Sequence, residues 1–238
     1  MSDATSDARP VGKEACPDCG SSDNLVRYSD GHAYCFTPGC ARFERENGDV
    51  SAPQRRETRM DYDFLTGEVR ALRARGIAEE TCAKFGYLVG RDKHDQPVQI
   101  AQYRDRETGL MLCAQKLRFP DKGAGMPVIG DIDKAGLFGE HLWKGARQRD
   151  DWKARVVVCE GEIDAMSIAQ VFNLTMPVVS IKRGAASAKK DCQQSLAFLE
   201  AHDEIILWFD ADEAGRKAVA ECAPLFSPGK VRIVETPQ

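Results

Sequence analysis

Hydrophobic and polar residues follow a regular pattern from Arg155 to the end of the sequence. Short apolar runs rich in Val and Ile alternate with segments in which apolar residues recur every three to four positions. The apolar runs are typical of buried strands, and the other segments are typical of amphipathic helices. Strands are predicted over 155–159, 177–182, 204–209 and 230–235, and helices over 162–173, 187–201 and 213–223. Strands that alternate with helices predict a parallel sheet with right-handed crossovers.

The preceding segment, residues 63–150, has a mixed pattern. Leu65, Val69 and Leu72, followed by Gly76, predict an amphipathic helix that ends at the glycine. The other elements predicted here are a short helix over 79–85, a hairpin with strands over 98–103 and 110–119, and a loop over 123–136. This segment is slightly basic, with 15 basic and 13 acidic residues, whereas residues 151–238 have 10 and 13. An α+β basic subdomain is therefore expected before the α/β domain.

The first 62 residues lack long periodic segments. Residues 1–13 are polar and predict a flexible tail, and residues 46–62 have the composition of a linker. Between them, residues 14–45 contain short aromatic-bearing strands around a turn. We therefore expect a multi-domain α/β protein with a small all-β module at 14–45, the α+β subdomain at 63–150 and the α/β domain at 151–238.

Four cysteines of the N-terminal module have the spacing of a zinc ribbon. Cys16 and Cys19 form one close pair, and Cys35 and Cys40 form a second pair about 15 residues later. Four residues separate the cysteines of the second pair, where two are usual, so His32 is an alternative to Cys40 as the fourth ligand. Structural zinc supplies folding free energy to so small a module.

The remaining sequence statistics bear on compartment and partners. The other five cysteines are scattered singly, which is typical of a reducing cytoplasm. There is no apolar run of about 18 residues and no hydrophobic leader, so we expect an unexported protein that does not enter a membrane. A net charge of −4 excludes a general basic coat but leaves room for a local basic groove.

Acidic residues follow two of the predicted strands of the α/β domain. Glu160 comes after the first strand, and Asp210 and Asp212 come after the third. Ligands bind at the carboxyl ends of parallel strands, and clustered carboxylates suit Mg²⁺, with Mn²⁺ as a substitute. The alternative is that these acids cap the helices that follow, because Asp is common at helix N-termini.

Two further groups of polar residues have both a functional and a structural interpretation. Lys116 and Arg118 lie on one face of a predicted strand with Lys122 just beyond, an arrangement that binds a triphosphate or a nucleic-acid backbone, or is a solvated sheet face. Asp30 and His32 lie at the tip of the ribbon hairpin, where they either read base edges or form a polar turn.

A strand that ends in Glu160-Gly161, followed about 50 residues later by a strand that ends in Asp210-x-Asp212, resembles the Toprim fold of bacterial-type primases, topoisomerases and some nucleases. With the ribbon before it, the whole chain resembles the primase half of the bifunctional primase–helicases of T7-like phages. The motifs that carry this resemblance are Ser29-Asp30-Gly31-His32, Ala74-Arg75-Gly76-Ile77, Tyr103-Arg104-Asp105, Gln115-Lys116, Leu137-Phe138-Gly139, Glu160-Gly161-Glu162-Ile163-Asp164, Gly184-Ala185 with Lys189-Lys190, and Asp210 to Lys217.

This resemblance implies a DNA primase, a nucleotidyltransferase that makes short RNA primers on single-stranded DNA at a short recognition sequence. Glu160, Asp210 and Asp212 would hold Mg²⁺ in a two-metal mechanism, with Lys116 and Lys122 as further catalytic residues acting on the nucleotide and the growing chain. Asp30 and His32 would read the template. Residues expected to contact nucleotide or DNA backbone are Arg118, Gly161, Lys182, Arg183, Lys189 and Lys190.

The implied partners are single-stranded DNA, ribonucleoside triphosphates, a replicative helicase, fused or separate, and a DNA polymerase, in the cytoplasm of a bacterial host. No GxxxxGK[ST] phosphate loop occurs in the sequence. The family usually has one more acid just past the last strand, so we expect full activity to need residues beyond Gln238. The alternative is a non-catalytic recombination mediator with a zinc site and a Toprim fold, whose cysteines lie close before the Toprim segment, whereas about 120 residues separate them here.

Overall fold

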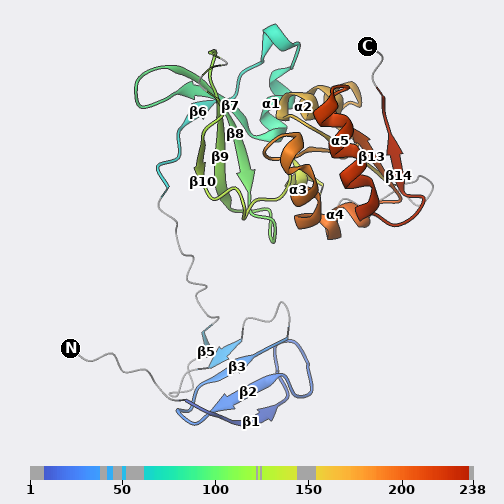
Figure 1. The fold of residues 1–238 in the computed structure, drawn as a ribbon. Helices are drawn as coiled ribbons and strands as arrows, with labels where there is room; N and C mark the ends of the chain where they lie inside the picture. Colours follow the sequence, from blue (N-terminus) through green and yellow to red (C-terminus); the bar gives the residue numbers. More distant parts are fainter. Residues whose placement is uncertain are drawn as a thin grey trace. The chain divides into compact units, whose positions relative to one another are not determined.

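The chain forms two compact units, Met1–Arg59 and Met60–Gln238. The computed structural model describes residues 8–37, 42–44, 50–51, 62–121, 123, 125–143 and 154–235. Figure 1 shows both units, which are described in turn below.

The first unit is a five-stranded antiparallel sheet whose strands pair in chain order. Its strands are β1 (Pro10–Glu14), β2 (Leu25–Tyr28), β3 (Ala33–Cys35), β4 (Phe43–Glu44) and β5 (Val50–Ser51). The core cluster of the described residues is small and consists of Cys16, Leu25, Ala33 and Cys35. Because two of these four residues are cysteines, apolar burial alone contributes little to the stability of this unit.

The second unit begins with another antiparallel sheet, in the order β10-β9-β8-β7-β6. Its strands are β6 (Gly67–Glu68), β7 (Tyr87–Arg91), β8 (Pro97–Arg104), β9 (Leu112–Arg118) and β10 (Val128–Gly130), and helix α1 (Glu79–Phe85) precedes β7. The predicted helix over 79–85 and the predicted hairpin are thus confirmed. The hairpin register pairs Ala101 of β8 with Lys116 of β9.

The predicted helix between Leu65 and Gly76 is wrong. Described here instead are β6 and a 3-10 turn at Arg73–Arg75. The buried amide of Gln115 accepts a hydrogen bond from the Leu65 N–H and donates one to the Leu65 carbonyl, each at 2.8 Å. These bonds satisfy the Leu65 backbone in an extended conformation, so tertiary contacts override the helical spacing of the apolar residues.

The predicted loop over 123–136 is also only partly correct, because it contains β10. This strand pairs with β9 in a register that places Val128 opposite Lys116. Strand β9 therefore has a neighbour on each side, which fixes the direction in which its side chains point.

The rest of the second unit is a four-stranded parallel sheet in the order β12-β11-β13-β14. Its strands are β11 (Arg155–Cys159), β12 (Val178–Ser180), β13 (Glu204–Trp208) and β14 (Val231–Ile233), and its helices are α2 (Glu162–Val171), α3 (Ala188–Gln194), α4 (Leu196–Glu200) and α5 (Glu213–Cys222). The predicted alternation is confirmed. The predicted helix over 187–201 is divided at Ser195, whose hydroxyl donates to the buried Glu140 carboxylate at 2.6 Å.

Phe138 joins the two sheets of the second unit, which lie side by side in Figure 1. Its ring centroid lies 5.5 Å from those of Phe85 and Tyr103, and its backbone N–H donates to the carbonyl of Ser180 in β12 at 3.0 Å. The next residue, Gly139, has φ 82°, and a Cβ there would lie 2.7 Å from the Phe85 ring. The Leu-Phe-Gly motif thus joins both sheets into one core.

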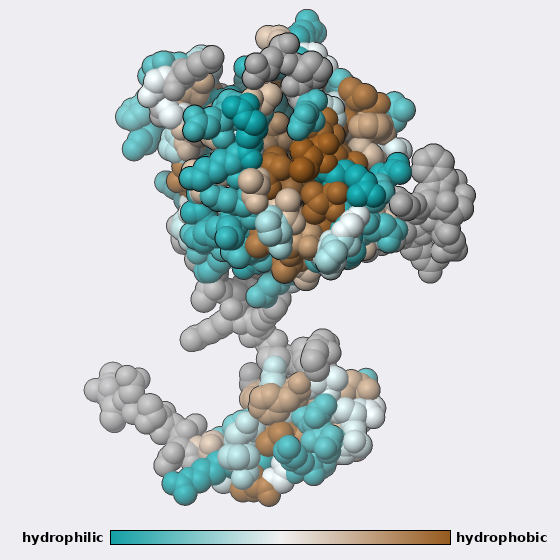
Figure 2. Space-filling model, turned by 45° about the vertical axis from the view of Figure 1, so that its right-hand side comes forward, coloured by the Kyte–Doolittle hydropathy of each residue, from teal (hydrophilic) through white to brown (hydrophobic). Residues whose placement is uncertain are grey.

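The face of the second unit that Figure 2 shows is mostly hydrophilic and includes an apolar area. Among the residues that the structure describes, no helix is long and apolar enough to span a bilayer. An apolar area surrounded by polar residues is common where proteins contact a partner.

Candidate active site and zinc ribbon

One pocket of about 470 Å³ lies between strands β9 and β10 and the carboxyl end of the parallel sheet. It brings together basic residues of the antiparallel sheet and acidic residues of the parallel-sheet part. The residues that line it are Lys116, Arg118, Met126, Val128, Glu160, Gly161, Glu162, Asp164, Lys182, Arg183, Gly184 and Asp210.

Glu160 follows β11 directly, so the carboxyl end of a buried strand places it in the pocket. Its Oε1 accepts a hydrogen bond from the Ala185 N–H at 3.3 Å. Its Oε2 is buried and has no hydrogen-bond partner among the described residues. Burial and the negative charge of Asp210 raise the pKa of Glu160. A buried carboxylate oxygen without a partner, beside a second acid, fits a divalent cation.

Asp210 lies just beyond β13 and is exposed at the pocket wall. Its backbone is packed tightly against Gly215 of helix α5, where an added Cβ would lie 2.0 Å from the Asp210 carbonyl oxygen. Only glycine fits at position 215 without moving Asp210. The close approach of Gly215 to the Asp210 backbone therefore fixes the position from which the Asp210 carboxylate enters the pocket.

Asp212 has a structural role as well. It is the N-cap of α5, and its Oδ1 accepts a hydrogen bond from the Gly215 N–H at 2.7 Å. It is not among the residues that line the pocket, but its charge contributes to raising the pKa of Glu160. The capping alternative is thus realised at Asp212, and a cap does not exclude a metal contact through the other oxygen.

Two substitutions separate these roles of Asp212. Asn caps helices as well as Asp does, whereas Ala costs about 1 kcal/mol at an N-cap. If the pocket serves the RNA primer synthesis that the sequence resemblance implies, Asp212→Asn should lower that synthesis at least about tenfold with an unchanged free energy of unfolding. A loss of only about 1.4 kcal/mol of charge stabilisation already slows a reaction tenfold. Asp212→Ala is expected to lower both. Urea unfolding and RNA product measured on the same samples test this, and full synthesis by Asp212→Asn would leave Asp212 with the cap alone.

A third acid of the pocket, Asp164, was missed as a site residue in the sequence. It lies in the first turn of α2, and burial and the charge of Asp210 raise its pKa. Its Oδ2 lies 2.7 Å from the position of a Cβ on Gly161, so glycine there leaves room for it. The signal was present in the sequence, because a residue four positions after Glu160 lies in the first turn of the helix that starts at the pocket.

Lys116 is held in the pocket by two acceptors. Its ammonium lies 2.7 Å from Glu162 Oε1 and donates to the carbonyl oxygen of Lys182 at 2.9 Å. The Tyr103 hydroxyl donates to the same Glu162 oxygen at 2.6 Å. The side chains of Lys116 and Glu162 are only 11% and 4% exposed, so Lys116 is not on a solvated sheet face.

The remaining basic residues have different environments. Arg118 lines the pocket. Arg183 and Lys190 both bind Asp133, the latter at 2.9 Å, and their hydrogen bonds hold the pKa of Asp133 well below its usual range. Lys189 is exposed on α3.

Two lysines that were expected to contact nucleotide or nucleic acid, Lys182 and Lys122, need separate treatment. The expected nucleic-acid contact of the Lys182 side chain is not supported, because its ammonium is fully buried and donates to Ala135 and Gln194 inside the protein. Lys182 does line the pocket, where its carbonyl oxygen accepts from Lys116. Lys122 lies outside the described residues.

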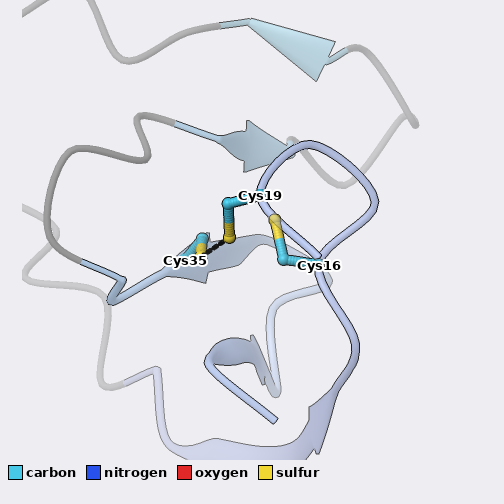
Figure 3. Close-up of side chains that lie close together, drawn as sticks. All are labelled: Cys16, Cys19 and Cys35. Carbon is cyan, nitrogen blue, oxygen red and sulfur yellow. Dashed lines mark hydrogen bonds between the residues drawn. The ribbon is translucent and has the colours of Figure 1, made fainter. Parts of the chain in front are cut away.

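The first unit brings three of the four predicted zinc ligands together. The sulfur atoms of Cys16, Cys19 and Cys35 lie within 4.8 Å of one another, and those of Cys19 and Cys35 are 3.7 Å apart (Figure 3). Hydrogen bonds with Ser21 and Thr37 lower the pKa of the Cys19 thiol to about 5, which favours the thiolate that binds metal. Cys40 lies outside the described residues. The donor set fits a tetrahedral zinc site with one more ligand.

His32 is not a member of this cysteine group within the described part of the chain. Its Nδ1 lies 2.5 Å from Asp30 Oδ1, and its ring stacks on Tyr28 with the centroids 4.3 Å apart. The backbone N–H of His32 also donates to Asp30, at 3.2 Å. Asp30 and His32 therefore form one linked pair at the tip of the β2–β3 hairpin.

A cysteine-bearing ribbon joined to a parallel sheet with acids at its strand ends is typical of primases of the Toprim class. The family model described as "Bacteriophage T7 DNA helicase/primase, N-terminal a+b fold" matches residues 67–125, and the model described as "Toprim-like" matches residues 157–238. The chain belongs to the DNA primases of the T7-like phage helicase/primase family. The family and the fold class expected from the sequence are thus confirmed.

Individual relatives match most of the chain. A DNA helicase/primase of Enterobacteria phage T3 is 37% identical over 231 residues, which are 93% of this chain and 39% of that protein. The crystal structure of the primase fragment of the phage T7 primase-helicase is 34% identical with a TM-score of 0.65, covering 96% of this chain and 91% of that one. The chain thus spans about two fifths of the curated relative but nearly the whole primase fragment.

A second solved structure, 40% identical with a TM-score of 0.63, covers 72% of this chain and 82% of that one. It contains primase domains of phage T7 bound to an RNA/DNA hybrid and dTTP, together with the phage's lagging-strand DNA polymerase. These matches extend over the α+β subdomain as well as the Toprim part, which favours a primase over the recombination mediator.

Proposed function

We propose that this chain synthesises short RNA primers on single-stranded DNA from ribonucleoside triphosphates. The observation that carries the proposal is the pocket in which the unpartnered Glu160 oxygen and Asp210 lie opposite Lys116. Acids beside a cation suit a reaction in which a triphosphate is bound and negative charge develops at its α-phosphate. The subdomain at 63–150 would supply Lys116 and Arg118, and the domain at 151–238 the acids.

Glu160, Asp210 and Asp212 would hold Mg²⁺, or Mn²⁺ in its place, and Asp164 lies near enough to contribute. Bound there, the metal would supply charge neutralisation and an acidified primer 3′-hydroxyl. The Lys116 ammonium has three N–H groups, and two have acceptors among the described residues. The third would bind a phosphate oxygen, with Arg118 as a second cation and Lys122 as a third.

Arg183, Lys189 and Lys190 would contact the backbone of the nucleic acid at the pocket rim. Gly161 would let it approach closely, because no side chain intervenes there. These contacts are weakened by salt.

The ribbon would hold structural zinc through Cys16, Cys19, Cys35 and Cys40, and would read the template through His32 and Asp30. If the His32 Nδ1–H donates to Asp30, neutral His32 presents Nε2 as an acceptor. An acceptor there would pair with an amino group on a base edge.

Asp30→Ala tests this reading of the template. It removes the acceptor that faces Nδ1, so the proton is no longer held on Nδ1 and Nε2 is no longer fixed as an acceptor. We expect the preference among template sequences to change by about tenfold, the effect of one good base contact, while extension of a preformed primer is unchanged. Sequencing of primer start sites on a random template library measures the preference. An unaltered distribution of start sites would remove Asp30 from template recognition.

The cellular location and the protein partners are proposed from the relatives. We propose that the chain works in the cytoplasm of a bacterial host with a replicative helicase, fused or separate, and with a DNA polymerase. The T3 relative is a helicase/primase, and the T7 primase domains interact with a lagging-strand polymerase.

The test is incubation of the purified chain with random single-stranded DNA, labelled ribonucleoside triphosphates and Mg²⁺. We expect short, template-dependent RNA, and none when Mg²⁺ is chelated. DNA binding without RNA product would support the recombination mediator instead.

A further inference from the structure

The backbone from Lys182 to Ala185 contacts both charged walls of the pocket. The carbonyl oxygen of Lys182 accepts a hydrogen bond from the Lys116 ammonium at 2.9 Å. The N–H of Ala185 donates to Glu160 Oε1 at 3.3 Å. One short piece of backbone therefore positions both the cation and the acid on which the proposed function depends.

The side chain of Lys182 anchors this backbone from inside the protein. Its ammonium donates to Gln194 Oε1 at 2.6 Å and to the carbonyl oxygen of Ala135 at 3.1 Å, and lies 3.6 Å from Asp191 Oδ1. The backbone N–H of Lys182 donates to the other Asp191 oxygen at 2.8 Å. Lys182 is thus bound to α3 at both its backbone and its side chain.

This arrangement is costly in free energy, which sets it apart from an ordinary surface lysine. The side chains of Lys182 and Asp191 are both 0% exposed, and burial lowers the pKa of the Lys182 ammonium. A buried ion pair adds little net stability compared with apolar residues of the same size. Its definite consequence is geometrical, because the charges must stay together and so fix the backbone between them.

We propose that Lys182 is a positioning residue, whose buried contacts with Asp191, Gln194 and the Ala135 carbonyl fix the 182–185 backbone and so place Lys116 opposite Glu160. This inference rests on the proposed function, because it takes Lys116 and Glu160 as its working groups. It replaces the direct nucleic-acid contact that the sequence suggested for Lys182. The residue acts through its carbonyl and not through its charge.

A double-mutant cycle tests the coupling between Lys182 and Lys116. The measurement is the dissociation constant of a fluorescent ATP analogue without divalent ions, which reports on Lys116 independently of primer synthesis. We expect Lys182→Met to weaken binding about tenfold in the wild-type background, a value within the range of coupling between contacting residues. In the Lys116→Met background the same change is expected to have less than about a twofold effect, because no ammonium is left to position. An equal effect in both backgrounds would overturn the proposal.

Asp191→Asn separates positioning from simple electrostatics. It removes a negative charge near the pocket, so electrostatics alone predicts tighter binding of the ATP analogue. Positioning predicts weaker binding, by about threefold, because the buried ammonium loses its counter-ion and shifts. Tighter binding by Asp191→Asn contradicts the proposal.

Controls for folding and for charge complete the test. Thermal unfolding is followed for each variant, and if Lys182→Met does not fold, Asp191→Asn and Lys116→Met form the cycle. Lys93→Met, at the exposed turn between β7 and β8, is a matched control that should leave binding unchanged. If the wild-type chain makes no primers, the proposed function fails, but the cycle still decides whether Lys182 places Lys116.

Discussion

Replacing Asp210 by Asn is expected to abolish primer synthesis, lowering the rate by about 1,000-fold or more. Removing one carboxylate from a metal site loses several kcal/mol of charge stabilisation, and each 1.36 kcal/mol is tenfold in rate. Asn has the same shape, and the contact with Gly215 involves only the backbone of residue 210. The fold should therefore be retained while the charge is lost. The measurement is the rate of RNA synthesis on a single-stranded template at saturating Mg²⁺.

Two controls accompany Asp210→Asn. Zinc content should remain at the wild-type level, because the ribbon is a separate unit. Glu221→Gln removes an acid from the exposed end of α5, where it pairs with Lys217 at 3.9 Å, and should leave synthesis unchanged. Synthesis by Asp210→Asn within a few fold of wild type would remove Asp210 from the metal site.

Chelation of zinc is expected to unfold the first unit and leave the second folded. Structural zinc contributes about 10–16 kcal/mol of apparent binding free energy to small modules, which is more than their total stability. The core cluster of this unit has four residues, and two of them are cysteines. Amide NMR signals of β2 and β3 should collapse towards random-coil positions. All three tryptophans, Trp143, Trp152 and Trp208, belong to the second unit, so tryptophan emission should not change.

The fourth zinc ligand is decided by two substitutions. With an all-cysteine set, Cys40→Ser should lower the affinity for zinc, whereas His32→Ala should retain one equivalent and lose only template preference. The His32 contact with Asp30 and its stacking on Tyr28 favour this outcome. Zinc retained by Cys40→Ser but lost by His32→Ala would assign the ligand to His32.

In the chelation experiment, unfolding of the second unit, which contains the tryptophans, would contradict the independent folding of the two units.

The elements that were predicted correctly are those in which burial and periodicity agree. Strands β11 and β13 are apolar along most of their length and end in acids, so both their positions and the site at their ends could be read from the sequence. The stretch from Leu65 to Gly76 could not, because the amide of Gln115, 50 positions away, satisfies its backbone. Spacing within a segment carries no information on such a partner.

The site residues were predicted less completely than the strands, for a related reason. Glu160, Asp210 and Lys116 line one pocket, because topology brings strand ends and strand faces together. No role was assigned to Glu162, and Lys182 was expected to contact nucleic acid, since a charged residue in a motif looks the same whether it is buried or exposed. Only the structure distinguishes a lysine that faces a ligand from one that fixes the backbone.

The shared core around Phe138 has a consequence for how the pocket takes up its substrate. A ring packed against Phe85 and Tyr103, with a backbone bridge to Ser180, joins the described parts of the two halves of the second unit into one core. We therefore expect the distance between Lys116 and the acids to be set before a nucleotide binds. We expect a preorganised pocket, in which no binding free energy is lost in bringing Lys116 and the acids together. Nucleotides would then bind and leave without a domain movement.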